Sequence, residues 1–259
     1  MGNVKELTPI QIGILIGDRY IKGGYKENWG KEGYPRWFYP TGVTLWSLCL
    51  LTDRTKEKNY LDFARDCFRY YIENDRVEID TGQADPMDLT GAMGHAAVEV
   101  YNRTREQNVL NLSKRIAEFI VNKQPRLLDG TFCYFKHPEL RRIWIDSLFM
   151  VCPLLVKIGK ITGEERYYDE VIKQLFAFTV RLQDPLKRLF YQRWGWEIYK
   201  TTHSPGFWGR GNGWVLMAMT EVLDTLPEGY KARQTLSDVY KVFIHEIIRH
   251  QDKTGMWHQ

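Results

Sequence analysis

A threonine recurs at the end of four apolar segments, and this repeat constrains the fold more than any other feature of the chain. Successive threonines lie 49, 58 and 63 residues apart. The repeat consists of Thr55, Thr104, Thr162 and Thr225, and the residues five positions later are Tyr60, Val109, Tyr167 and Tyr230. Spacings of this length are typical of stacked helical hairpins, in which a short connection joins one helix to the next.

Hydrophobic periodicity predicts nine helices in the 259 residues. They span residues 7–22, 40–53, 57–74, 88–103, 106–123, 145–161, 164–183, 213–225 and 230–251. In each hairpin the first helix is apolar nearly all round, as in residues 148–155, and the second is amphipathic and charged, as in residues 60–74. Since helices that are apolar on all sides are buried and amphipathic helices face water, we expect inner helices sheathed by outer ones.

The sequence shows no linker, so we predict a single domain over residues 1–259. Four inner helices are few for a closed ring, and we therefore expect an all-α toroid of helical hairpins that is incomplete at its C-terminal end. An open ring exposes apolar helix faces, which favours self-association through that edge. Alternating apolar residues at 130–135 and 189–194 predict short β-hairpin pieces near the functional end.

Composition excludes several classes of function. The formal net charge is only +4, and no basic run exceeds two residues, so we expect no nucleic-acid partner. No apolar run reaches the length of a membrane span. The N-terminus shows no secretory signal, and the four cysteines form no CxxC pair. Together these features predict a cytoplasmic protein with reduced cysteines that binds no membrane.

Metal and cofactor motifs are missing from the sequence. His245 and His250 superficially match a zinc-protease helix, but five residues separate them, which places them on different faces. The glycine-rich segment 209–213 follows no predicted strand and lacks the Lys-Ser/Thr pair of a phosphate-binding loop. There is no Gly-x-Ser-x-Gly nucleophile elbow either. We expect no metal and no cofactor.

The segment from His203 to Val215 is the most informative stretch for function. It contains a proline, four glycines, Trp208, Arg210, Asn212 and Trp214. The glycines predict irregular structure up to about Gly213, followed by a helix. Such a loop at a helix N-terminus brings backbone N–H groups and a guanidinium close to an anionic or hydroxylated ligand, and its indole rings suit a sugar face. The alternative is a turn whose tryptophans only pack.

Two aspartates stand where inner helices begin. Asp146 precedes the most apolar inner helix, where it is either a helix cap or a general acid whose pKa is raised by Trp144 and the apolar residues that follow. Asp88 has the same relation to the preceding inner helix, although Asp85 competes as the cap because Pro86 follows it. Neighbouring helices pack about 8–10 Å apart, so Asp88 and Asp146 could face one another across a pocket. Paired carboxylates are the usual apparatus of glycoside cleavage.

The candidate site residues stand at the openings of the four predicted inner helices. Tyr39 precedes the first inner helix, where it is either a pocket phenol or a packing side chain. The others are Asp88, then Trp144 with Asp146, then Trp208, Arg210 and Trp214. We expect these loops to lie on one rim of the toroid.

Two strings of residues carry a resemblance to a known family. Trp144-Ile-Asp146 followed by Leu148-Phe-Met150, and Trp208-Gly-Arg-Gly-Asn-Gly-Trp214, resemble glycoside hydrolase families 88 and 105, the unsaturated glucuronyl and rhamnogalacturonyl hydrolases. Residues 37–39 with Gly42, and residues 252–257, match more weakly. The resemblance covers essentially the whole chain and implies an (α/α)6 toroid.

The resemblance also implies roles for individual residues. Asp146 corresponds to the acid/base, and Asp88 to its partner. The residues implied to line the sugar subsite are Tyr39, Trp144, His203, Trp208, Arg210, Asn212 and Trp214. The implied substrate is an acidic oligosaccharide derived from pectin or a glycosaminoglycan. Its terminal C4=C5 double bond is hydrated, with Arg210 or His203 near the substrate carboxylate, and the reaction uses no metal or protein nucleophile.

The chain departs from this family because members usually continue well beyond the Thr-Gly-x-Trp loop and supply further inner helices. Two alternatives therefore remain beside the hydrolase. One is a catalytically impaired sugar-binding or assembly fragment of the same fold. The other is a different α/α-toroid glycosidase that acts on saturated sugars.

Overall fold

The structure is a computed structural model that describes residues 7–23, 29–30, 32–79, 86–134, 142–195 and 202–258. Asp85, the competing cap, lies outside these residues. Within them the chain forms nine helices and one two-stranded sheet, and every predicted helix is present. The predicted all-α architecture is confirmed.

The helices alternate between an inner and an outer layer. The inner helices are α2 (Tyr39–Thr55), α4 (Pro86–Thr104), α6 (Ser147–Thr162) and α8 (Gly209–Thr225). The outer helices are α1 (Pro9–Ile21), α3 (Asn59–Glu73), α5 (Gln107–Lys123), α7 (Glu165–Leu182) and α9 (Arg233–Arg249). Each inner helix packs on the next inner helix, and α3, α5, α7 and α9 each pack on the inner helix before them. This is the concentric order that the hairpin pattern predicts.

The recurring threonines form the turns between the inner and outer helices. Thr55 donates from its hydroxyl to the carbonyl of Leu51 (2.8 Å) and accepts from the N–H of Glu57 (3.2 Å). Thr104 and Thr162 make the same pair of bonds in their turns. A threonine here satisfies one backbone carbonyl at the helix end and one N–H of the connection. For these three threonines, the repeat seen in the sequence is therefore a repeated turn.

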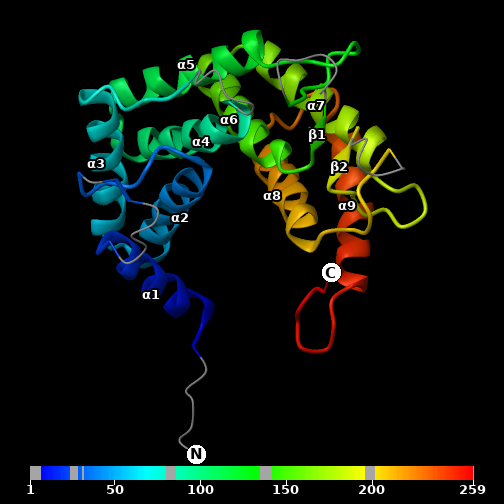
Figure 1. The fold of residues 1–259 in the computed structure, drawn as a ribbon, viewed down its shortest axis with the longest axis horizontal. Coiled ribbons are helices and arrows are strands. Elements are labelled where there is room, and N and C mark those ends of the chain that lie inside the picture. The colour runs from blue at the N-terminus through cyan, green and yellow to red at the C-terminus, as the bar shows by residue number, and fades with distance from the viewer. Residues whose placement is uncertain are drawn as a thin grey trace, which may run out of the picture.

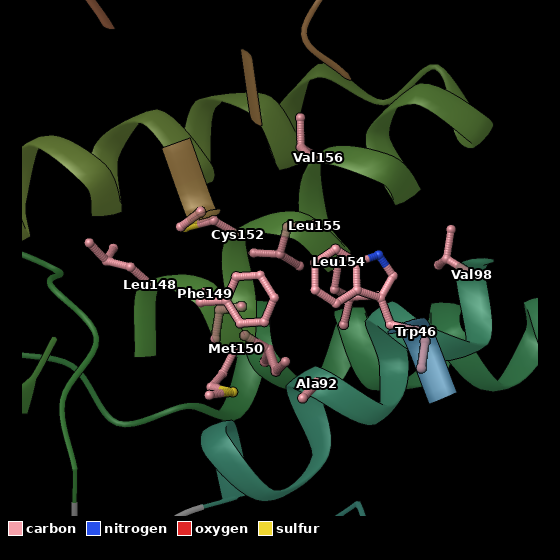
Figure 2. Close-up of a cluster of buried hydrophobic side chains, with 14 of the residues drawn as sticks. Trp46, Ala92, Val98, Leu148, Phe149, Met150, Cys152, Leu154, Leu155 and Val156 are labelled. Atoms are coloured by element: carbon pink, nitrogen blue, oxygen red, sulfur yellow. The ribbon is translucent and has the colours of Figure 1, made fainter. Parts of the chain in front are cut away.

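Small residues bring the inner helices close together. A Cβ on Gly42 of α2 would lie 2.5 Å from a backbone carbon of Ala92, and a Cβ on Gly91 of α4 would overlap the backbone of Met150. Figure 2 shows a cluster of buried apolar side chains from these helices, with Trp46 from α2, Ala92 and Val98 from α4, and a run of residues from α6. Most of α6 is buried, which explains why its sequence is apolar nearly all round.

The four inner helices run in the same direction. Moving along α2, Gly42 and then Trp46 meet Ala92 and then His95 of α4. From α4 to α6, Gly91 and then Gly94 meet Met150 and then Leu154. From α6 to α8, Phe149 and then Lys157 meet Trp214 and then Glu221. The first turns of all four inner helices consequently lie at one end of the molecule.

A charged cluster occupies the half of the inner layer away from those first turns. The Lys157 ammonium lies 2.6 Å from Glu99, 2.5 Å from Glu221 and 2.9 Å from His95. These contacts join α4, α6 and α8. Because Lys157 bonds to three acceptors, its charge is compensated despite its burial.

Helix α8 begins earlier than the glycines predict, and that expectation was wrong. It starts at Gly209, so that Arg210 and Asn212 belong to its first turn. Glycine is tolerated in a first turn, and Gly211 has a packing reason to be there. A Cβ on Gly211 would lie 2.8 Å from the Trp208 ring and 3.0 Å from Ile145.

Short β pieces are present as predicted. Strand β1 (Ile143–Trp144) pairs antiparallel with β2 (Arg193–Trp194), with Ile143 opposite Trp194 and Trp144 opposite Arg193. Isolated bridges add residues from the two predicted segments, at Phe132, Tyr134 and Phe190. The pairing brings the residues before α6 beside those before α8.

The helices form an arc that is open between α1 and α9 (Figure 1). Both edges of this opening carry exposed apolar side chains, including Leu15 and Ile16 on α1 and Ile248 on α9. Among the described residues, none of the helices combines enough length with enough apolar character for a transmembrane span. Self-association through the opening stays a prediction.

Candidate active site

Asp146 occupies the N-cap position of α6 without acting as a cap. Its backbone is helical (φ −52°, ψ −35°), and its side chain makes no capping hydrogen bond. Its Oδ2 is buried and has no hydrogen-bond partner among the described residues. Burial raises the pKa of Asp146, while the Arg210 and Arg193 guanidinium groups act in the opposite direction. The capping interpretation therefore fails, and a general-acid role for this buried carboxyl group stays a prediction.

Asp88 lies in the first turn of α4, beside the first turn of α6. The Ser147 hydroxyl donates to Asp88 Oδ1 at 3.1 Å, and the Tyr134 phenol donates to Oδ2. Ser147 directly follows Asp146 in the chain. The structure therefore brings the two predicted carboxylates to adjacent helix openings.

Trp144 packs against Tyr134, which bonds to Asp88, and against Arg193. Its ring centroid lies 4.6 Å from that of Tyr134, and the guanidinium carbon of Arg193 lies 5.0 Å from it. The pairing of β1 with β2 sets Arg193 opposite Trp144. Arg193 also acts electrostatically on Asp146. A second arginine thus stands near the proposed acid.

The first turn of α8 contributes Trp208 and Arg210. The guanidinium carbon of Arg210 lies 4.3 Å from the centroid of the Trp208 ring. Arg210 is exposed and forms no ion pair within the described part of the chain. Its charge lowers the pKa of Asp146, so the guanidinium lies within electrostatic range of that carboxyl. An exposed guanidinium without a carboxylate partner is suited to an anionic ligand.

Asn212 is buried and bonds to protein backbone. Its Oδ1 accepts from the N–H of Phe190 at 2.8 Å, and its Nδ2 donates to the carbonyls of Phe190 (3.0 Å) and Trp208 (3.1 Å). The amide therefore fixes the segment before β2 against α8. A sugar contact by Asn212 stays a prediction.

Tyr39, His203 and Trp214 complete the predicted set. His203 Nε2 donates to the carbonyl of Arg181 at 2.6 Å, and its ring stacks on Tyr191 with centroids 4.6 Å apart. Trp214 stacks on Phe149 of α6 at 5.0 Å, so it belongs to the aromatic layer between the inner helices. Tyr39 is the first residue of α2 and is half-buried.

A cavity of about 630 Å³ adjoins this rim. It lies between the first turn of α8, the end of α9 and residues 256–258. Arg210, Phe207, Leu216 and Trp257 line it, whereas Asp88 and Asp146 do not. Arg210 therefore lines this cavity and also acts electrostatically on Asp146.

Sequence reasoning missed three residues of this site: Tyr134, Ser147 and Arg193. The sequence places Tyr134 and Arg193 only in predicted short strands, because nothing local indicates which side chain a strand presents to a helix opening. Ser147 carried one signal, its position next to Asp146. Long-range pairing of β1 with β2 places Arg193, and this pairing is not visible in either segment alone.

The alternating inner and outer helices define the α/α-toroid fold class, and solved glycoside hydrolase structures share this fold. A family 105 glycoside hydrolase from C. acetobutylicum superposes with a TM-score of 0.78 at 25% identity, covering 95% of this chain and 68% of that one. A possible GH105 member from Klebsiella pneumoniae gives a TM-score of 0.78 at 21% identity, covering all of this chain and 70% of that one.

The family model described as Glycosyl Hydrolase Family 88 matches residues 18–259, so the chain belongs to that family. The unsaturated rhamnogalacturonyl hydrolase YesR of Bacillus subtilis is 22% identical over 249 residues, which are 93% of this chain and 67% of that protein. An unsaturated 3S-rhamnoglycuronyl hydrolase of Formosa agariphila is 36% identical over 121 residues, 44% of this chain and 32% of that protein. The matched segments thus cover about two thirds of the first relative and about one third of the second.

Proposed function

We propose that this protein removes a terminal unsaturated uronic acid from acidic oligosaccharides by hydrating the C4=C5 double bond. Membership of Glycosyl Hydrolase Family 88 supports the substrate class. The observation that carries the proposal is the state of the Asp146 side chain. Its Oδ2 is buried and has no hydrogen-bond partner within the residues that the structure describes, and burial raises the pKa of the carboxyl group. A protonated carboxyl with a free oxygen is what protonation of a double bond requires.

The proposed reaction begins with proton transfer from Asp146 to C4. A water molecule then adds its oxygen to C5 and gives a proton back to the Asp146 carboxylate, so the acid is regenerated. The resulting hemiketal opens by breaking the bond between C5 and the ring oxygen, which leaves a ketone at C5. The hemiacetal at C1 then releases the neighbouring sugar. One water is consumed for each glycosidic bond broken.

Arg210 is the better of the two predicted partners for the substrate carboxylate. Arg210 is exposed and close enough to Asp146 to lower the pKa of that carboxyl. His203, in contrast, uses Nε2 to donate to a backbone carbonyl. Trp144 and Trp208 are proposed to face the sugar ring, and Asp88 is the proposed partner carboxylate.

Oligosaccharides from pectin or glycosaminoglycans are the proposed source of the substrate, because polysaccharide lyases leave the required double bond. A cytoplasmic site of action is proposed as well. Its support is the four cysteines, all of which are buried and form no disulfide bond with one another, as expected in a reducing compartment.

The test uses a lyase-generated unsaturated disaccharide and follows the ultraviolet absorbance of its double bond. We expect the parent protein to remove the absorbance and Asp146→Asn to lower kcat by about 10³-fold, since a general acid contributes about 10²–10⁴-fold. Asp66→Asn on outer helix α3 is the control and should match the parent.

Two results of this test reject the proposal. One is an Asp146→Asn variant as active as the parent. The other is calorimetric binding of the disaccharide by the parent without turnover, which favours the catalytically impaired alternative. Activity on a saturated chromogenic glycoside indicates the other α/α-toroid glycosidase.

A further inference from the structure

A buried three-residue cluster lies at the opening of α4 and α6. Tyr134 and Ser147 are each 1% exposed, and Asp88 is 7% exposed. Both Asp88 oxygens accept a hydrogen bond, Oδ2 from the Tyr134 phenol and Oδ1 from Ser147 at 3.1 Å. The Ser147 and Tyr134 hydroxyl oxygens lie 3.3 Å apart. The carboxyl group is therefore held at both of its oxygens.

Tyr134 also contacts the segment that carries the proposed acid. Its backbone N–H donates to the carbonyl of Arg142 at 2.8 Å, just before β1. Its ring packs on Trp144 with centroids 4.6 Å apart. One tyrosine thus joins Asp88 on α4 to the strand that leads into Asp146.

Hydrogen bonds donated to a carboxyl group favour its ionised form and restrict its rotation. We propose that Tyr134 is a positioning residue, which holds Asp88 as a carboxylate in one orientation beside the opening of α6. The catalytic consequence rests on the proposed function, whereas control of Asp88 by Tyr134 does not. Tyr134 itself need not touch the substrate, since it acts through Asp88.

Carbon-13 NMR of the side-chain carboxyl groups tests the control of Asp88 without any substrate. The Asp88 signal is assigned by its loss in Asp88→Asn. We expect Tyr134→Phe to raise the titration midpoint of Asp88 by about one pH unit, which corresponds to a lost hydrogen bond worth about 1.4 kcal/mol. Ser147→Ala should shift the midpoint in the same direction by less, and it serves if Tyr134→Phe folds poorly.

Tyr167→Phe is the matched control. The Tyr167 phenol also is buried and donates to a carboxylate, Glu118 at 2.6 Å, but it lies between outer helices α5 and α7. Removal of this phenol should leave the Asp88 midpoint unchanged. Equal shifts from both variants would indicate a general loss of structure and overturn the proposal.

Kinetics test the positioning role on the unsaturated disaccharide. We expect Tyr134→Phe to lower kcat by about 10–100-fold with little change in KM, because misplacement of a catalytic group costs up to about 10²-fold. The acidic limb of the pH profile should move to higher pH. In an Asp88→Asn background, Tyr134→Phe should cause no further loss, since it acts through Asp88.

An unchanged titration midpoint of Asp88 in Tyr134→Phe overturns the proposal. It is also overturned if the double variant loses as much kcat as the product of the two single losses. If the parent protein shows no turnover, the proposed function fails. The NMR titration then still decides whether Tyr134 controls Asp88.

Discussion

Burial and nearby arginines act on Asp146 in opposite directions, and burial is the larger effect. The pKa of this carboxyl is therefore raised above its unfolded value. For such a group, the stability contribution is fully present below the unfolded pKa and is lost as the pH rises through the folded pKa. Asp146 thus lowers the free energy of unfolding at neutral pH, where the unfolded chain favours the ionised carboxyl group. Such a loss of stability is expected at a proposed catalytic site.

Asp146→Asn should consequently be more stable than the parent at pH 7. Thermal melts across pH measure this directly. We expect the two proteins to melt together below about pH 4, the ordinary range for an unfolded aspartate, and the variant to melt higher as the pH rises. Asp169→Asn is the control, and it should melt lower than the parent at pH 7. The reason is that hydrogen bonding from Tyr230 lowers the pKa of Asp169. A parent that melts higher than Asp146→Asn at pH 7 contradicts the account.

Arg210→Ala tests the proposed carboxylate contact. A hydrogen bond to a charged group contributes about 1.5–3 kcal/mol, so KM for the unsaturated disaccharide should rise about 10–100-fold. The basic limb of the pH profile should also move to higher pH, because the arginine lowers the pKa of Asp146. Arg210→Lys keeps the charge and should lose less.

The methyl ester of the same disaccharide provides the control substrate for Arg210. Its neutral ester has no charge for the guanidinium to bind, so parent and Arg210→Ala should have similar KM values on it. If Arg210→Ala raises KM equally on the acid and on the ester, Arg210 does not act through the substrate carboxylate.

At the scale of elements, close approach of inner helices α4 and α6 sets the separation of the two carboxylates. Gly91→Ala puts a Cβ against the backbone of Met150, which cannot move aside as a flexible side chain can. We expect a loss of about 1–3 kcal/mol in the free energy of unfolding, measured by urea denaturation, together with reduced turnover because Asp88 lies three residues away in α4.

Gly213→Ala is the matched control for Gly91→Ala. A Cβ at Gly213 of α8 has no neighbour within 4 Å. Alanine is a better helix former than glycine by about 1 kcal/mol, so this variant should be slightly more stable than the parent. If both glycine variants lose stability alike, the close helix approach is not what glycine provides at position 91.

The helices could be predicted from sequence because each carries its own pattern. Apolar residues recur with helical period, and Thr55, Thr104 and Thr162 mark the turns between the layers. The start of α8 could not be predicted. Its glycines indicate a loop, whereas in the structure Gly211 serves the packing of Trp208 and Ile145. The sequence around a glycine does not reveal whether that glycine forms a loop or permits close packing.

The candidate site could be predicted only in part. Asp146 and Arg210 could be found because each stands at a helix opening with a distinctive neighbour, Trp144 or Trp208. Tyr134 and Arg193 could not, since strand pairing and the packing of separate segments bring them there. Asn212 stands inside the recognisable string, but its amide bonds to the backbone of Phe190.

At the scale of the whole molecule, four parallel inner helices among the described residues present their first turns at one end of an open arc (Figure 1). Asp146, Asp88 and Arg210 lie at that end, and the Lys157 cluster lies further along the same helices. The chemistry proposed here depends on this arrangement, because a carboxyl donor and a cation must reach one sugar together.

Simultaneous recording of double-bond absorbance and released sugar on one unsaturated disaccharide tests this account most directly. Hydration at C4=C5 destroys the double bond before the neighbouring sugar can leave. The account therefore predicts that absorbance falls at least as early as the sugar appears, in equal molar amounts, and that Asp146→Asn loses both signals. Sugar release that precedes the fall in absorbance, or release with the double bond retained, would contradict it.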